Sequence, residues 1–288
     1  MTRIKDLNKL ARNRGSFVGA SEKGLIARTK VMEKRLNSYV IKNLVPSLDI
    51  KGGKVVNSAT NLKRINKITG LKKFMREVVN LSMHDYYGRQ YKGLESRTTP
   101  YFNELGLTTK KSDQVLSKGQ LSVNGFLDSL FDNNDIARQL QSTIRTAISS
   151  NKEISELNIL LSEQIKGKED KFGLIQNFHY KNKGYDSFQN YSRTLDEGFS
   201  KVLNLNYAIY AGGKIKTTRP FCIERSGKVF NRETIQSWND DDWQGKIEDG
   251  DVLIDAGGYN CRHDYDWISY ELAKRIDKNI EKSNFDKK

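Results

Sequence analysis

Cysteines, histidines and long apolar runs are scarce in this chain. Its 288 residues include two Cys and three His, so its stability cannot depend on a disulfide framework, which is typical of a reducing compartment. No run approaches the roughly 18 apolar residues of a transmembrane helix. The segment MTRIKDLNKLARNRGSF lacks the apolar core of a secretory signal peptide. We therefore expect no membrane association, and one large domain or two modest ones.

Positive charge is concentrated in the first quarter of the chain, which has a formal net charge of +14. Residues 1–78 contain 19 Lys and Arg against 5 Asp and Glu, whereas the remaining residues contain 30 of each kind. This asymmetry predicts a polyanionic neighbour, most commonly nucleic acid. The alternative is a solvated basic helix face without a partner. The predicted nucleic-acid-binding residues are Lys5, Lys9, Arg12, Arg14, Lys63, Arg64, Lys67, Lys72 and Lys73.

Apolar periodicity predicts helices through most of the first two thirds of the chain. Apolar residues recur at steps of three and four over 24–44 and 136–148, as in amphipathic helices. The other predicted helices span 58–91, 150–167 and 171–210, with breaks near Gly70 and Gly184.

Two N-terminal segments lack this periodicity. Residues 1–23 are basic and predict a flexible arm, and residues 92–120 carry Pro100 with several Ser and Thr, which predicts a loop. The segment DIKGGKVVNS predicts a turn or a short hairpin.

Shorter elements are predicted beyond residue 207. YAIYAGG alternates as a strand does and ends in a Gly-Gly turn, and KTTRPFCIERSGKVF is typical of two short strands joined by Ser-Gly. DVLIDAGG predicts a strand or an extended segment. NRETIQSW predicts a short helix capped by Asn231, and DWISYELAKRIDKNIEKS predicts a closing helix.

Together these elements predict an α+β fold that is predominantly α. A helical N-terminal two thirds is followed by a small α+β C-terminal module. The predicted regions are a basic flexible arm (1–23), a basic helical region with a loop (24–120), a helical core (121–206) and an α+β module that ends in a helix (207–288).

The densest group of reactive side chains lies in GGYNCRHDYDW, residues 257–267. Cys261 and His263, with the distant Cys222, could bind zinc, but structural zinc needs four ligands, usually supplied in two close pairs. The Cys-x-His spacing would place two side chains on opposite faces of a strand, so a tight turn would be needed. The candidates for a fourth ligand are His84, His179 and Asp264.

Two catalytic interpretations are also open. A Cys–His nucleophile pair would need a third group to orient His263 and an oxyanion hole, and the sequence marks neither. Asp264 and Asp266, or the acids of NDDDW (239–243), could form a carboxylate pair, but acidic residues that flank a tryptophan are usually solvated loop ends.

A structural role fits the local composition better. Gly257 and Gly258 permit close approach of the chain, and the surrounding aromatic residues supply the buried area that a small module needs. Arg219 and Arg262 could tie loops together by donating to carbonyls or carboxylates. The cysteines are then small buried side chains that could lie adjacent and oxidise. We therefore predict no catalytic residue, no bound metal and no cofactor.

Four segments between residues 135 and 270 carry a family resemblance through their order and spacing. STIRTAISSNKEISELNILLSEQI contains a helix, a polar turn and a Glu-Leu step, and NYSRTLDEGFSKVLN contains an Arg-Thr pair followed by an acidic residue. KTTRPFCIERSGKVF and GGYNCRHDYDW contain a Thr-Arg-x-x-Cys and an Asn-Cys-Arg-His motif. The chain thereby resembles the phage Mu F-like minor head proteins, the head-morphogenesis family of tailed bacteriophages. The matching residues are Arg193, Thr194, Glu197, Thr218, Arg219, Cys222, Asn260, Cys261, Arg262 and His263.

The resemblance implies a structural, non-enzymatic protein of the phage virion. Such a protein assembles in the host bacterial cytoplasm and resides in the head interior or neck. Its implied partners are the portal or other head proteins and packaged double-stranded DNA, which the basic N-terminal region would contact non-specifically. Two alternatives are an injected effector enzyme with a Mu F-like module, either a nuclease or a cysteine-dependent hydrolase, and a cytoplasmic adaptor with a basic arm.

Overall fold

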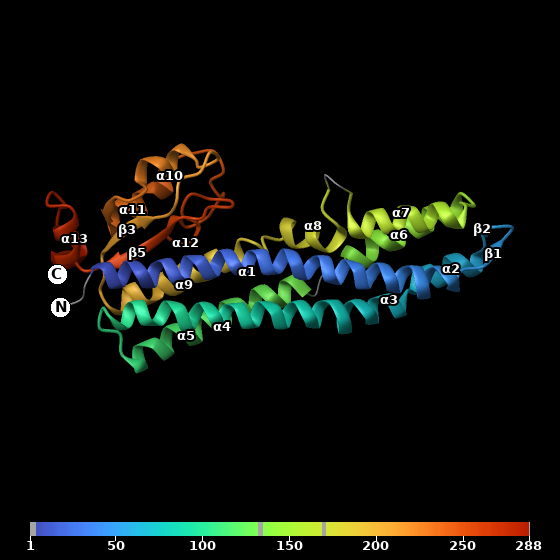
Figure 1. Ribbon diagram of the computed structural model, residues 1–288, viewed down its shortest axis with the longest axis horizontal. Coiled ribbons are helices and arrows are strands. Elements are labelled where there is room, and N and C mark those ends of the chain that lie inside the picture. The colour runs from blue at the N-terminus through green and yellow to red at the C-terminus, as the bar shows by residue number, and fades with distance from the viewer. Residues whose placement is uncertain (1–3, 132–134, 169–170, 288) are drawn as a thin grey trace. The chain divides into compact units, whose positions relative to one another are not determined.

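A computed structural model describes residues 4–131, 135–168 and 171–287 (Figure 1). It is 69% helical, with long N-terminal helices and a small α+β region toward the C-terminus, which confirms the predicted fold class. Within the described ranges, no helix is both long enough and apolar enough to cross a membrane. Residues 1–3 of the expected arm lie outside these ranges.

Helices and short strands alternate only in the C-terminal part of the chain. The described α-helices are α1 (Ile4–Tyr39), α2 (Ala59–Lys67), α3 (Thr69–Phe74), α4 (Leu81–Asn103), α5 (Thr109–Phe131), α6 (Asp135–Ser149), α7 (Ile154–Lys166), α8 (Leu174–Lys181), α9 (Ser187–Val202), α10 (Pro220–Arg225), α11 (Arg232–Ser237), α12 (Val252–Asp255) and α13 (Tyr270–Ile276). The strands are β1 (Ile50–Lys51), β2 (Lys54–Val55), β3 (Tyr207–Ala211), β4 (Val229–Asn231) and β5 (Asp264–Ile268). Two π-helical segments, η1 (Val40–Leu44) and η3 (Met75–Asn80), and the 3-10 turns η2 (Val45–Ser47), η4 (Trp238–Asp240) and η5 (Asn284–Lys287) complete the set.

The chain forms two compact units, each assembled from separate stretches. Unit 1 contains Met1–Glu22, Arg89–Asn124 and Tyr185–Lys288, and unit 2 contains Lys23–Gly88 and Gly125–Gly184. Helices α1, α4 and α5 contribute residues to both units. The units therefore do not follow the four consecutive regions that we expected, because segments far apart in sequence pack together.

The expected flexible arm is instead part of helix α1. Leu7, Arg14 and Val18 are buried at steps of seven and four residues, and buried positions continue at steps of three and four as far as Leu36. One face of this helix is therefore covered. The basic and polar residues between these positions concealed that face in the sequence.

The expected loop at 92–120 is also mostly helical. Helix α4 continues to Asn103 and α5 begins at Thr109, which leaves only a short turn between them. Pro100 lies inside α4, and the neighbouring Tyr101 is 1% exposed. Burial of aromatic side chains stabilises this helix where local propensity is weak.

Helix α9 is the central element of unit 1. Residues on nearly every side of it are buried, including Phe188, Leu195 and Phe199, as in a helix that passes through a core. It packs against α12 and β5. The sheet of unit 1 has the strand order β4-β3-β5 with antiparallel pairing, so the predicted strand β3 is confirmed as its centre.

Three predictions in the C-terminal region are wrong. KTTRPFCIERSGKVF contains α10 before β4 rather than two strands, and Pro220 suits the first turn of α10 because no N–H donor is needed there. DVLIDAGG forms the short helix α12, where the Asp251 side chain accepts from the Leu253 N–H. The segment from Asp264 forms strand β5 before the helix α13 begins, since it pairs with β3 along its length.

Three predictions that rested on a specific local signal are confirmed. Asn231 caps α11, with its Oδ1 accepting from the Thr234 N–H at 2.9 Å. Strands β1 and β2 form the hairpin expected in DIKGGKVVNS. The break expected near Gly184 separates α8 from α9.

Unit 2 contains α2, α3, α6, α7 and α8 with parts of the longer helices. The predicted apolar faces of α6 and α7 are buried, with Leu140, Ile144 and Leu161 fully covered. Helix α6 packs against α2 and α7. The break expected at Gly70 lies instead at Ile68, whose φ is 26°, between α2 and α3.

Candidate functional site

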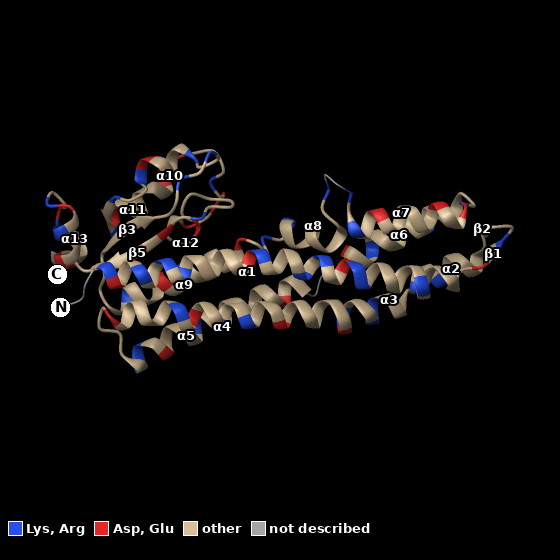
Figure 2. Cartoon of the chain, in the orientation of Figure 1, with Lys and Arg blue, Asp and Glu red and all other residues tan. Residues whose placement is uncertain are grey.

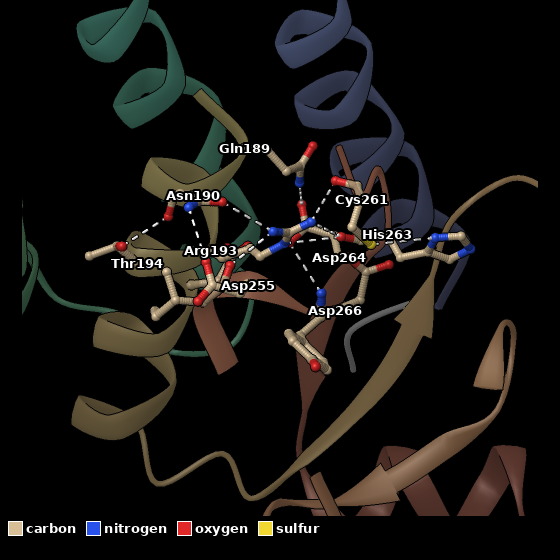
Figure 3. A network of polar contacts seen from close by, with 12 residues as sticks. Gln189, Asn190, Arg193, Thr194, Asp255, Cys261, His263, Asp264 and Asp266 are labelled. Atoms are coloured by element: carbon tan, nitrogen blue, oxygen red, sulfur yellow. Dashed lines mark hydrogen bonds and ion pairs between the residues drawn. The ribbon is translucent and has the colours of Figure 1, made fainter. Parts of the chain in front are cut away.

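Arg14 lies in a buried cluster of carboxylates in unit 1. Its guanidinium donates to Asp196 Oδ1 at 2.6 Å and to Asp266 Oδ1 at 2.9 Å. Its Nη2 lies 3.5 Å from Asp264 Oδ2. The same oxygen accepts from Gln189 Nε2 at 3.1 Å (Figure 3). The Arg14 side chain is 2% exposed. These contacts join α1, α9 and β5, and we refer to Arg14, Asp196, Asp264 and Asp266 as the charge cluster.

The geometry of β5 brings two of these acids together. Alternate residues of a strand point to the same face of a sheet, so Asp264 and Asp266 share the face that meets α9. Our expectation that they are solvated is wrong, since they are 8% and 7% exposed. The aromatic residues beside them do not mark a loop end, because they belong to a strand buried on both faces.

Burial raises the pKa of the acids in this cluster. It raises the pKa of Asp266 to about 6, against the opposing effect of Arg14 and with a contribution from Asp264. Burial is also the main cause that raises the pKa of Asp196. Burial alone would lower the pKa of Arg14, but the three carboxylates raise it, so the guanidinium stays charged. The cluster therefore combines a permanent cation with a carboxyl that takes up a proton below about pH 6.

Arg193 ties α9 to the segment that precedes β5. Its Nε and Nη2 donate to His263 O at 3.0 and 2.7 Å, and Nη2 also donates to Cys261 O at 2.8 Å (Figure 3). Its Nη1 donates to Ile254 O at 2.9 Å. The residue is 1% exposed. A guanidinium has five N–H donors and can therefore bind several carbonyl oxygens at once. Here these hydrogen bonds fix the backbone at Cys261 and His263.

Cys222, Cys261 and His263 converge, and we refer to them as the thiol cluster. The two sulfurs are 3.8 Å apart, and Cys261 Sγ lies 3.9 Å from His263 Nδ1. The three potential ligand atoms all lie within 4.8 Å of one another, and all three residues are buried. Residues 261–263 are not in a strand, and they follow a turn at Asn260, whose φ is 55°. Cys261 and His263 are therefore not forced onto opposite faces of a strand, and both side chains can reach Cys222.

Tyr210 and Gly257 enclose the thiol cluster. Tyr210 Oη lies 3.3 Å from Cys222 Sγ, and its ring stacks on the His263 ring at a centroid distance of 5.1 Å. The Gly257 N–H donates to Cys261 Sγ at 3.3 Å. A Cβ atom at position 257 would lie 2.3 Å from Cys222 Sγ, so a side chain there would displace the sulfur.

The two thiols differ in acidity. The hydrogen bond from Cys222 is the largest cause that lowers the pKa of Cys261, and His263 and Arg193 add to it against the effect of burial. For Cys222 the same hydrogen bond is the largest cause that raises the pKa, followed by burial. This pattern favours a thiolate at Cys261. A thiolate beside an imidazole can bind a metal ion or act as a nucleophile.

Arg219 and Arg262 tie loops together, as expected. Arg219 Nη2 donates to Tyr259 O at 2.5 Å. Arg262 is exposed and pairs with Asp186 at 3.3 Å and with Glu22 at 3.2 Å.

Thr194 and Asn260, two further residues of the predicted motif, also lie outside both clusters. Thr194 donates within α9 to Asn190 O at 2.9 Å. Asn260 is exposed at the turn before Cys261. The predicted motif thus divides into residues that meet around the thiols and residues that shape the segments beside them.

The predicted nucleic-acid-binding residues also divide. Lys5, Lys9 and Arg12 are exposed on α1 in unit 1, but Arg14 is buried, so its prediction is wrong. Its charge is matched by the acids of α9 and β5 rather than available to a partner. In unit 2, the predicted residues Lys63, Arg64, Lys67, Lys72 and Lys73 are all exposed. They belong to α2 and α3, where Figure 2 colours the Lys and Arg positions blue.

Four of the cations in unit 2 are not neutralised by nearby acids. In the described parts of the chain, no carboxylate lies within 4.0 Å of Lys63, Lys67, Lys72 or Lys73, whereas Arg64 pairs with Asp49 at 2.5 Å. Lys72 and Lys73 also line a cavity of about 390 Å³ in unit 2. We refer to the four lysines as the basic patch.

Sequence reasoning did not identify Asp196 or Tyr210 as members of the site. Asp196 lies 182 residues from Arg14 along the chain, so no local pattern could pair them. One signal in the sequence could have pointed to Asp196. Helix α9 carries several aromatic residues, which predict burial, and polar residues in a buried helix must pair with other polar groups. Tyr210 was placed correctly in a strand, but its neighbours depend on how α10 and the segment after α12 fold back.

Comparisons with known proteins identify no relative. No protein-family model matches the chain, and no curated protein or solved structure is significantly similar to it. Inferences about function therefore rest on the residues and the geometry of the two units.

Proposed function

We propose that this chain is a structural component of a tailed-bacteriophage virion. In this role it is a minor head protein near the portal, in the head interior or the neck, and it takes part in head morphogenesis. Its partners are the portal or other head proteins and packaged double-stranded DNA, which it contacts non-specifically. The Mu F-like motifs described above support the structural role, and the exposed cations support the contact with DNA.

The basic patch is the observation that carries the proposal. Its four lysines lie exposed on two successive helices, without neighbouring acids among the described residues. Lysines in this state attract the phosphate backbone, and the counterions they release make the affinity fall as salt rises. Lys5, Lys9 and Arg12 add exposed cations in unit 1. Both the basic patch and the cations of unit 1 are suited to contacting phosphates, and contacts to phosphates carry no sequence information. We therefore expect binding without sequence preference.

The two buried clusters support a structural rather than a reactive role for the motif residues. Arg193 donates hydrogen bonds to the backbone carbonyls of Ile254, Cys261 and His263. The side chains of Cys222 and Cys261 are buried, at 2% and 4% exposed. Groups held in this way fix a fold and do not meet a large substrate. We therefore include a non-enzymatic role in the proposal.

Salt-dependent DNA binding by the full chain tests the proposal. The variant Lys63→Gln/Lys67→Gln/Lys72→Gln/Lys73→Gln removes the basic patch and adds no repulsion. The logarithmic slope of affinity against salt should become shallower by roughly one unit for each phosphate that is no longer neutralised, about three to four in all. The measurement is fluorescence anisotropy with two duplexes of unrelated sequence over a range of salt concentrations.

The matched control carries the same charge change elsewhere. Lys214→Gln/Lys216→Gln/Lys278→Gln/Lys282→Gln removes four exposed lysines of the C-terminal region, and its slope should stay near that of the wild type. Equal losses in the two variants would show that binding depends on net charge alone. No measurable DNA binding by the wild type at low salt would remove the DNA contact from the proposal.

The contact between Cys261 and His263 favours a second candidate, an injected cysteine-dependent hydrolase. The lowered pKa of Cys261 and the nearby imidazole are features of an activated nucleophile. Such an enzyme must let substrate reach the sulfur. Thiol labelling of the folded chain tests this candidate, because a buried structural thiol stays inert while an accessible thiolate reacts within minutes. Fast labelling at Cys261 alone would favour the hydrolase.

A further inference from the structure

The thiol cluster has the spacing of a metal site. Two separate segments supply its members: α10 carries Cys222, while Cys261 and His263 follow the turn at Asn260. Tetrahedral zinc with bonds of about 2.3 Å to sulfur holds two sulfur ligands about 3.8 Å apart. The two sulfurs here are 3.8 Å apart.

The imidazole of His263 lies close to the position that a third zinc ligand would occupy. Zinc bonds of about 2.3 Å to sulfur and 2.1 Å to nitrogen place those atoms about 3.6 Å apart. Cys261 Sγ and His263 Nδ1 are 3.9 Å apart, and all three ligand atoms lie within 4.8 Å. With both sulfurs fixed, the distances of the imidazole nitrogen to the sulfurs would have to shorten by at most about 1.2 Å to reach this spacing.

The surroundings of the cluster favour coordinated sulfur. The Gly257 N–H points at Cys261 Sγ, and the Tyr210 hydroxyl lies within reach of both sulfurs. Outer donors of this kind stabilise thiolate ligands and orient them toward a metal. The ring of Tyr210 holds the imidazole of His263 by stacking. In the part of the chain that the structure describes, His263 Nε2 has no hydrogen-bond partner, so the polar contacts of the ring lie on the Nδ1 side.

We propose that Cys222, Cys261 and His263 bind one zinc ion, with a water molecule as the fourth ligand. Two thiolates and one imidazole form a soft ligand set that prefers zinc to calcium or magnesium. Among the described residues, no further His, Cys, Asp or Glu joins this group, so none of these supplies the fourth ligand. The ion links α10 to the segment before β5, and it therefore stabilises unit 1. This inference does not depend on the proposed virion role.

Metal analysis of the full chain tests the proposal. Protein from zinc-supplemented cells, passed over a desalting column, should contain close to one equivalent of zinc. Cys222→Ser, Cys261→Ser and His263→Gln should each lose most of it. The matched control is His84→Gln, which removes an exposed histidine of α4 and should keep the full equivalent. Because a metal-free variant could also misfold, tryptophan fluorescence should show that unit 1 is still folded in each variant that is compared.

Cobalt substitution of the unmodified chain gives a readout that needs no variant. Cobalt bound by two thiolates should produce thiolate-to-metal charge-transfer absorption in the near ultraviolet and strong visible bands of tetrahedral geometry. Zinc should displace it and abolish both signals. A wild-type chain that contains less than about a tenth of an equivalent of zinc and shows no such bands would overturn the proposal. A Cys222–Cys261 disulfide in freshly purified protein would overturn it equally, because a disulfide requires the sulfurs to close to about 2.05 Å.

Discussion

Unit 1 and unit 2 differ in what they bury and in what they expose. Among the described residues, unit 1 buries three arginines with the acids that neutralise them; these residues are Arg14, Arg193, Arg232, Asp196, Glu197, Asp264 and Asp266. Unit 2 buries mainly apolar side chains, together with Glu33 and His179. Its lysines on α2 and α3 lie on the surface instead. The excess positive charge of residues 1–78 is therefore divided between an internal role and an external one.

This difference shows that a basic residue cannot be assigned to a partner from charge alone. Arg12 and Arg14 lie two residues apart on one helix, yet the first is exposed and the second meets three carboxylates. A buried ion network contributes little net stability when it is complete, but removal of one member leaves the others unpaired in a medium of low polarity. Unit 1 should accordingly be far more sensitive than unit 2 to single charge changes.

The largest effect should come from Arg14→Ala. It leaves Asp196 and Asp266 buried without a paired cation and Asp264 with Arg193 alone, at 4.0 Å, which should lower the free energy of unfolding of unit 1 by about 3–5 kcal/mol. All three tryptophans, Trp238, Trp243 and Trp267, lie in unit 1. Urea denaturation followed by tryptophan fluorescence therefore reports this unit.

The control for Arg14 lies on the same helix. Arg12→Ala removes an exposed cation and should change the stability by no more than about 0.5 kcal/mol. A loss of similar size in both variants would mean that the charge cluster is not what makes unit 1 sensitive.

The next effect is a pH dependence in unit 2. Burial lowers the pKa of His179 to about 3, while a histidine in an unfolded chain titrates near about 6.5. Between these values the unfolded state binds a proton that the folded state excludes, so the contribution of His179 to the stability of unit 2 should fall as the pH is lowered. The contribution of His179 approaches about 1.4 kcal/mol for each pH unit within this window.

A variant isolates this contribution from the other titrating groups. The difference in stability between the wild type and His179→Gln should shrink as the pH falls from 7 toward 4, about as steeply as His179 alone predicts. Hydrogen exchange of the α8 amides, followed peptide by peptide, measures this local stability, and His84→Gln serves as the surface control. A difference that stays constant with pH would show that His179 does not exclude the proton.

A smaller effect should come from Gly257→Ala. The added Cβ would lie 2.3 Å from Cys222 Sγ and 3.0 Å from Cys261 Sγ, and overpacking of this kind costs about 1–3 kcal/mol. The control is Gly213→Ala, since a Cβ at position 213 has no neighbour within 4 Å. Tryptophan fluorescence again reports the unfolding of unit 1. Equal stabilities of the two variants would mean that the space beside the thiols is larger than described.

The smallest effect should come from Asp49→Asn in unit 2. Asp49 pairs with Arg64 at 2.5 Å, which is as short as the pair between Arg14 and Asp196, but both side chains are nearly half exposed. Water screens such a pair, so its loss should cost between 0 and about 1 kcal/mol. Thermal unfolding followed by circular dichroism measures it. A loss as large as that of Arg14→Ala would abolish the contrast between buried and exposed pairs.

Some features of this protein were decided by the sequence alone, because their causes act within a few residues. The periodic helices α6 and α7, the β1–β2 hairpin, the Asn231 cap and the strand β3 were all predicted from such local signals. The predominance of helix and the small α+β C-terminal region followed from them. The wrong assignments at α10, α12 and β5 concern segments of a few residues, where helical and extended patterns cannot be told apart before packing is known.

The tertiary structure alone decided which polar residues meet. Arg14 reaches Asp266 across 252 positions of the chain, and Cys222 reaches Cys261 across 39. The burial of Arg14 turned a predicted DNA contact into an internal cation, and the turn at Asn260 brought Cys261 and His263 to one side. The physical reason is that the energies of ion pairs and of metal coordination depend on distance and burial. Both quantities arise only when helices and strands from distant parts of the sequence have packed.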